Sequence, residues 1–175
     1  MTTQKNKSLV KAFEDRFIEG ALPQELEGFD KTRQAEAARF VGATGAVRKA
    51  GTPAIALESV ASDDEMRRMR LAVVNDDMPF LVDSIAATIG AHGIAIDRII
   101  HPVIAATRDA KGELQTIGEG NPESFVYIEM DRVDAKERRE LESEIARNLT
   151  HVRHAVDDWP ALKIAMNGDA DRVAS

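Results

Sequence analysis

The sequence contains no cysteine among its 175 residues. This absence excludes disulfides, thiolate metal sites, iron–sulfur clusters and cysteine nucleophiles. The sequence also lacks a run of the roughly 20 apolar residues that a membrane-spanning helix requires, so we expect no membrane association. Residues 1–7 are mostly polar and lead into charged helical sequence instead of the apolar core of a signal peptide, which predicts a cytoplasmic protein.

Basic residues are fewer than acidic ones, with 23 Lys and Arg against 30 Asp and Glu, and the formal net charge is -7. Proteins that bind DNA or RNA depend on clustered basic residues, so we expect no nucleic-acid partner. The composition, 43% hydrophobic and 30% charged, is that of an ordinary globular protein. A chain of this length forms either one domain with an extension or two small domains.

The first third of the chain is predicted to be mainly helical. Apolar spacing predicts helices at about 9–20 and 30–47 and a short strand at 53–57, and the polar connection Ser62-Asp63-Asp64-Glu65 follows. We therefore divide the chain near residue 62, into an N-terminal helical extension (1–62) and a compact unit (63–175). The sequence leaves open whether the early helices pack on that unit, contact another subunit or dock on a further part of the protein.

The compact unit has the element order strand, helix, strand, strand, helix, strand. Strands are predicted at 69–74, 94–106, 124–130 and 152–156, with helices from Pro79 and Asp134, a hairpin turn at 109–112 that pairs 113–117, and a terminal helix from Asp157. Each helix has a single apolar face, which suits an antiparallel sheet covered on one side. We therefore predict an α+β fold, a ferredoxin-like βαββαβ sandwich with an N-terminal helical extension and a C-terminal helix.

The densest polar cluster is Asn75-Asp76-Asp77, between the first strand of this unit and its helix. Backbone N–H groups of a helix N-terminus point into such a junction, so the carboxylate of a small molecule can dock there with its ammonium group facing Asp76 or Asp77. The alternative interpretation is that Asp77 caps the helix and Asp76 is solvated. The regular spacing of a calcium-binding loop is missing, so we predict no metal site.

Other candidate chemistry is weak. His151 and His154 lie three residues apart, and on an extended strand their side chains diverge, which disfavours zinc. His101 has no visible catalytic partner. Phe125 and Tyr127 share a strand face, as in RNA-recognition modules, but lack the basic and glycine residues of that signature. We therefore predict no catalytic residues and no RNA site.

One segment closely resembles a known family. It contains Asn75-Asp76-Asp77-Met78-Pro79-Phe80-Leu81 and is similar to a segment near the N-terminus of the very large bacterial NAD-dependent glutamate dehydrogenases. His101-Pro102-Val103, Glu123-Ser124-Phe125, Ile128-Glu129-Met130-Asp131 and Asp158-Trp159-Pro160 follow in the order that this family shows. The resemblance covers about residues 68–165.

The resemblance implies an ACT-like domain, a βαββαβ module that often binds amino acids and mediates subunit contacts. The ligand-binding residues that it implies are Asn75, Asp76, Asp77, Met78, Phe80 and Leu81. Ordinary ACT domains usually carry Asp-x-Pro-Gly-x-Leu here, and Phe80 stands at the glycine position. A bulky ring at that position favours a packing or interface role over effector binding.

Our leading hypothesis is a non-catalytic regulatory or assembly domain at the N-terminus of a large NAD-dependent glutamate dehydrogenase. The resemblance implies that the parent enzyme deaminates L-glutamate oxidatively to 2-oxoglutarate and ammonia with NAD, while this part of it holds no cofactor. The implied partners are the remainder of the same polypeptide, other subunits and a small amino-acid effector. Two alternatives stay open, a stand-alone amino-acid-sensing module that regulates a partner protein and a small acylphosphatase-like hydrolase.

Overall fold

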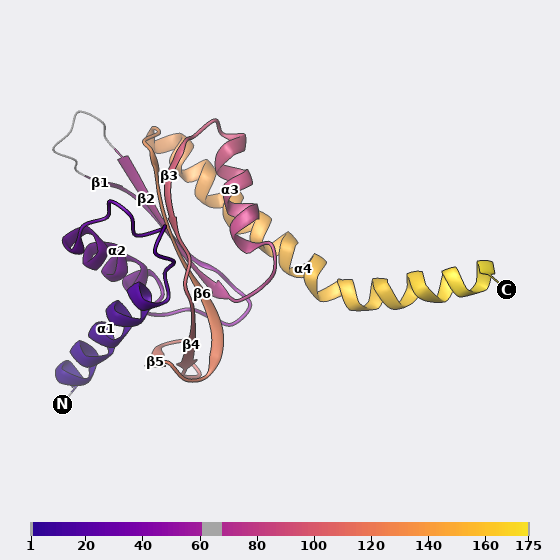
Figure 1. The fold of residues 1–175 in the computed structure, drawn as a ribbon, viewed down its shortest axis with the longest axis horizontal. Helices are drawn as coiled ribbons and strands as arrows, with labels where there is room; N and C mark the ends of the chain where they lie inside the picture. The colour runs from indigo at the N-terminus through magenta and orange to yellow at the C-terminus, as the bar shows by residue number, and fades with distance from the viewer. Residues whose placement is uncertain (1, 61–67, 175) are drawn as a thin grey trace.

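The computed structural model describes residues 2–60 and 68–174. The predicted polar connection at residues 62–65, and with it the predicted division at residue 62, lies outside the described residues. Figure 1 shows a single antiparallel sheet with a pair of helices against each of its faces, and a long helix that extends away from the rest.

The sheet has six strands in the order β1-β2-β6-β4-β5, with β3 also paired to β6. The strands are β1 (Ala54–Val60), β2 (Arg68–Asp76), β3 (Ile96–Ile100), β4 (Val103–Arg108), β5 (Leu114–Ile117) and β6 (Asn121–Asp131). All pairs are antiparallel. The predicted strand at 94–106 is interrupted at His101 and Pro102, because proline has no N–H to donate to the neighbouring strand.

Helices α3 (Leu81–Ala91) and α4 (Ala135–Ala174) cover the first face of the sheet. Their apolar positions recur every four residues, as the sequence predicts, and meet the inward side chains of β2 and β6. The buried residues of this core are Met69, Leu71, Val73, Leu81, Ile85, Ile89, Ile94, Val126, Ile128, Met130, Leu141, Ile145 and Leu149. Asp134 accepts hydrogen bonds from the backbone N–H groups of Lys136 and Glu137, which confirms the predicted start of α4.

Helices α1 (Thr2–Glu19) and α2 (Lys31–Thr44) cover the second face, so the prediction of a sheet covered on one side is wrong. The alternate residues of β6 explain this, because Phe125 and Tyr127 point away from α3 and α4 and need cover of their own. Phe13 of α1 packs against Phe125 with ring centroids 4.9 Å apart. The early helices therefore pack on the sheet, which was one of the three possibilities left open.

The outer strand beside β2 is β1, which comes before β2 in the chain. The predicted strand at 152–156 does not form, because this stretch continues α4, and the terminal helix does not start anew near Asp157. Val152 and Val156 are four residues apart, and this spacing fits the apolar face of a helix as well as it fits a strand. The α+β ferredoxin-like class is confirmed, with its fourth strand supplied from the N-terminal side.

Candidate functional site

The predicted ligand-binding residues lie at the turn where β2 ends and α3 begins. Asn75 is 1% exposed and faces α4, and its side-chain oxygen accepts a hydrogen bond of 2.9 Å from Arg153. Its side-chain nitrogen Nδ2 is buried and has no hydrogen-bond partner among the described residues. Asn75 therefore leaves both N–H donors of its side-chain amide unused beneath this turn between β2 and α3, called the corner below.

Asp76 is the last residue of β2 and forms ion pairs with two arginines, Arg48 after α2 and Arg153 on α4. One carboxylate oxygen accepts from Arg48 at 2.6 Å, and the other accepts from the N–H of Gly51 at 2.8 Å and lies 2.9 Å from Arg153. Burial raises the pKa of this carboxyl group, but the hydrogen bonds from Arg48 and Gly51 and the charges of Arg48 and Arg153 together outweigh burial and leave the pKa below its ordinary value. Asp76 is therefore a charged, structurally engaged group and not a solvated one.

Asp77 does not cap α3, so the capping interpretation is wrong. The N-cap residue is Phe80, whose side chain makes no capping hydrogen bond. Asp77 instead accepts a hydrogen bond of 2.7 Å from the hydroxyl of Ser124 on β6, and its N–H donates to the carbonyl of Pro122. These contacts fasten the turn to the neighbouring strand, and the N-cap residue gives the first N–H groups of α3 no side-chain acceptor.

His101 extends this polar contact into a chain of three groups. Its Nε2 lies 3.0 Å from the Ser124 oxygen, whose proton is already given to Asp77. In this arrangement His101 donates to Ser124, so it cannot accept the serine proton as a general base does. Burial lowers the pKa of His101, although the carboxylates of Asp77 and Glu25 oppose the shift. The neutral imidazole is therefore a structural donor.

The remaining predicted residues have unlike surroundings. Leu81 is buried in the core beside α4, and Met78 packs partly against the same core. Phe80 is 67% exposed, and its φ of 65° lies in the left-handed region that favours glycine. The ring points into solvent and does not fill a ligand space. The structure thus brings Asp77 near the start of α3, whereas the carboxylate of Asp76 is engaged by Arg48, Gly51 and Arg153.

A buried ion-pair cluster that the sequence did not predict lies next to Asp76. Glu123 is 3% exposed and accepts two hydrogen bonds of 2.8 Å from Arg108 and one of 2.7 Å from Arg48. Burial raises the pKa of Glu123, but the hydrogen bonds and the positive charges of Arg108 and Arg48 together outweigh burial and lower the pKa. These residues line a cavity of about 510 Å³ with Lys49 and Asp109. The only sequence signal for this cluster was its charge, since its members are far apart in the chain.

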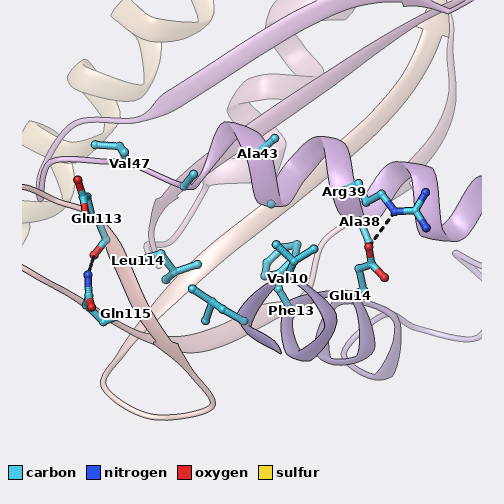
Figure 2. Close-up of a pocket in the computed structure, with 13 residues that line it drawn as sticks. Val10, Phe13, Glu14, Ala38, Arg39, Ala43, Val47, Glu113, Leu114 and Gln115 are labelled. Carbon is cyan, nitrogen blue, oxygen red and sulfur yellow. Dashed lines mark hydrogen bonds and ion pairs between the residues drawn. The ribbon is translucent and has the colours of Figure 1, made fainter. Parts of the chain in front are cut away.

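An apolar groove of about 450 Å³ lies between α1, α2 and the hairpin of β4 and β5, away from the predicted corner (Figure 2). Phe13 and Ala38 are buried at its base, and the ion pair between Glu14 and Arg39, 2.9 Å apart, lies at one end. Glu113 lies at the other end (Figure 2). The groove can take apolar side chains or a small apolar molecule.

Two further predictions concern His151, His154, Phe125 and Tyr127. Both histidines lie on α4, and the described residues contain no group of three or more side chains suited to a metal ion. Phe125 and Tyr127 are buried beneath α1 and α2 and are not available to stack on bases. Among the described residues, no helix is long and apolar enough to cross a membrane.

The family model described as "Glutamate dehydrogenase, ACT1 domain" matches residues 13–145. The chain belongs to this family. The match includes the C-terminal part of α1, the whole of α2, all six strands and the start of α4, so the ACT-like assignment extends to the helices on both faces of the sheet. It also crosses the predicted division at residue 62.

Two curated relatives of this ACT1 domain carry the name NAD-specific glutamate dehydrogenase. The protein from Halomonas elongata is 33% identical over 101 residues, which is 53% of this chain. The protein from Pseudomonas aeruginosa is 37% identical over 99 residues, which is 52% of this chain. In both cases the matched segment spans only 6% of the relative's own length.

Proposed function

We propose that this chain is a non-catalytic regulatory or assembly domain of a large NAD-dependent glutamate dehydrogenase. The observation that carries the proposal is the family match over residues 13–145. The parent enzyme would deaminate L-glutamate oxidatively to 2-oxoglutarate and ammonia, with NAD bound elsewhere in the polypeptide. The proposed partners are the rest of that polypeptide and other subunits, and the proposed location is the cytoplasm.

The contacts at the turn between β2 and α3 support a structural, non-catalytic role for its polar residues. Asp76, Asp77 and Glu123 are each held by other parts of this chain, and Ser124 and His101 are bonded to one another. Groups committed to such contacts are unavailable for acid–base or nucleophilic chemistry without rearrangement. The chain therefore supplies a rigid body, and the reaction would take place on other residues of the parent enzyme.

The test is to express both the complete native reading frame and this 175-residue chain and to assay NAD-dependent oxidation of L-glutamate. We expect turnover from the complete protein and none from the chain alone. Glutamate oxidation by the chain alone would contradict a non-catalytic role. A reading frame that stops soon after Ser175 would instead favour the alternative, a stand-alone amino-acid-sensing module that regulates a partner protein.

An amino-acid effector at the corner is a second element of the proposal, with Asn75, Asp76, Asp77, Met78, Phe80 and Leu81 as its ligand-binding residues. The side chain of Phe80 accepts no hydrogen bond from the first N–H groups of α3, which leaves these donors for a carboxylate. Asp77 lies three residues before Phe80, and its carboxylate would face the ammonium group of the same ligand. The unused Nδ2 of Asn75 adds a buried donor beneath the same turn.

Calorimetric titration of the chain with a panel of amino acids tests this element. We expect binding heat for at least one of them, and about a tenfold weaker affinity in Asp77→Asn, because a charged hydrogen-bond partner is lost. Asp157→Asn, an exposed change on α4, is the matched control and should bind normally. If no amino acid in the panel gives binding heat, the proposal of an amino-acid effector is contradicted and the assembly role remains.

A further inference from the structure

The outer half of α4 lies beyond the folded body. The helix runs from Ala135 to Ala174, which is about 60 Å at 1.5 Å per residue. Its first part packs in the core through Leu141, Ile145 and Leu149, whereas no other element of residues 2–60 and 68–174 lies beside its C-terminal part (Figure 1). An extended segment without tertiary contacts gains little stability from helix propensity alone, so a partner would stabilise it.

Apolar side chains continue along this free part of α4. Trp159, Leu162 and Met166 are exposed by 57%, 51% and 58%, and Ala155 is also exposed. The spacing of these residues is four, three and four, which is the heptad pattern of a coiled-coil seam. In heptad letters, Trp159 and Met166 occupy a positions and Ala155 and Leu162 occupy d positions. This seam therefore fits another helix with the same repeat.

Charges beside the seam select the partner. Asp158 falls at a g position and Lys163 at the following e position, and both are exposed. In a parallel pair of helices, a g residue faces the e residue five positions later on the other helix. Two copies of this segment would place Asp158 of each copy against Lys163 of the other. An antiparallel pair would put these charges on opposite sides of the seam.

We propose that residues 155–166 of α4 pair with the same segment of a second copy of this chain, as a parallel two-helix coiled coil. The seam is short, about two heptads, so the association is weak and depends on protein concentration. The inference depends on no property of the parent enzyme, only on the seam and its charges.

Sedimentation equilibrium of the 175-residue chain over a concentration series tests the proposal. We expect a monomer–dimer equilibrium, and Leu162→Glu should raise the dissociation constant about a hundredfold, because each dimer loses two buried leucines. Ile164→Ser is the matched control, since Ile164 is 75% exposed at an f position away from the seam. A chain that stays monomeric throughout, or a dimer that Leu162→Glu leaves unchanged, would overturn the proposal.

Charge reversal and cross-linking test the parallel orientation. Asp158→Lys should raise the dissociation constant about fivefold, and adding Lys163→Asp should restore it, whereas Asp157→Lys at an f position should change nothing. The chain has no cysteine of its own, so Ala155→Cys introduces one thiol per copy. Rapid disulfide formation between the copies when an oxidant such as copper–phenanthroline and air is added supports the parallel pair. Failure to cross-link, in a dimer that Leu162→Glu dissociates, would contradict it.

Discussion

The charged carboxylate of Glu123 is buried on β6, where it accepts three hydrogen bonds from Arg108 and Arg48. The side chains of Arg48 and Glu123 are 2% and 4% exposed, so water cannot replace a lost partner. The cluster also includes Asp76, which Arg48 and Arg153 hold from either side. It therefore ties the loop after α2 to β2, β4, β6 and α4.

Glu123→Gln should lower the free energy of unfolding by about 3–5 kcal/mol, because it leaves the two arginines charged and incompletely paired in the interior. Urea unfolding monitored by circular dichroism measures the change. Glu140→Gln, which removes an exposed ion pair with Lys136 on α4, is the control and should cost no more than about 0.5 kcal/mol. Equal losses in the two variants would contradict the dominance of the buried cluster.

His101 makes stability depend on pH. Burial lowers the pKa of this imidazole below its ordinary value of 6.5, so the unfolded chain binds the proton more readily than the folded one. The free energy of unfolding should therefore fall as the pH decreases below about 6.5, towards the lower pKa of the folded state. His101→Gln should remove that slope, and His154→Gln on the exposed side of α4 should keep it.

Unfolding measured at closely spaced pH values separates this effect from the carboxylates. The pKa values of Glu123 and Asp76 are lowered from ordinary values of 4.5 and 3.8, so their stabilisation is present above about pH 5 and is lost as the pH falls further. A slope between pH 7 and 5.5 that survives in His101→Gln would show that another group is responsible.

At the scale of elements, the turn between β2 and α3 contains one unfavourable backbone conformation. Phe80 has a φ of 65°, which costs about 1–2 kcal/mol for a residue with a side chain. The resemblance to ACT domains places glycine at this position, and the structure gives the physical reason, since the turn needs a left-handed residue to begin α3.

Phe80→Gly should raise the free energy of unfolding by about 1 kcal/mol, because glycine adopts this φ without steric cost. Phe80→Ala keeps the strained φ and removes only a ring that is 67% exposed, so it should change stability by less than about 0.5 kcal/mol. Thermal and urea unfolding of both variants measure these changes. A large loss in Phe80→Ala would show that the ring is buried by a contact in solution.

The sequence predicts those elements whose signals are local. Asp30 accepts hydrogen bonds from the N–H groups of Thr32 and Arg33, and the turn at 109–112 joins β4 to β5 as expected. The strand at 152–156 failed because its valines fit either period, and the helix already formed by Leu141 and Ile145 continues through them. The local pattern could not decide whether residues 152–156 form a strand or continue the helix.

The candidate site could be predicted only in part. The Asn75-Asp76-Asp77 turn is visible in the sequence because its polar residues are adjacent, but their orientations are not. Arg48 lies 28 residues before Asp76 and 75 residues before Glu123, and such distant ion pairs leave no local pattern. The unlike environments of Asp76 and Asp77 arise from the alternation of side chains at the end of β2.

At the scale of the whole molecule, β2 and β6 lie at the centre of two cores. Eight consecutive residues of β6, from Glu123 to Met130, are buried because helices cover both faces of the sheet. The early helices are held by more than apolar contact, since Arg33 donates two hydrogen bonds of 2.9 Å to Glu129 on β6. Arg98 and Arg33 also flank the ring of Phe29. The two layers thus share one sheet.

A chain of residues 63–175 tests whether the predicted compact unit folds alone. It would lose β1, which pairs with β2, and the α1 and α2 layer that buries Phe125 and Tyr127. We expect no cooperative unfolding transition and strong binding of a hydrophobic dye, because a large apolar face of the sheet becomes exposed.

The matched control is a chain of residues 1–159, which removes part of α4 but none of the residues of either core. It should unfold cooperatively with a midpoint close to that of the full chain, since no other described helix or strand lies beside this stretch of α4 (Figure 1). Cooperative unfolding of 63–175 at that same midpoint would contradict the shared-sheet interpretation, because the α1 and α2 layer would then add nothing to stability.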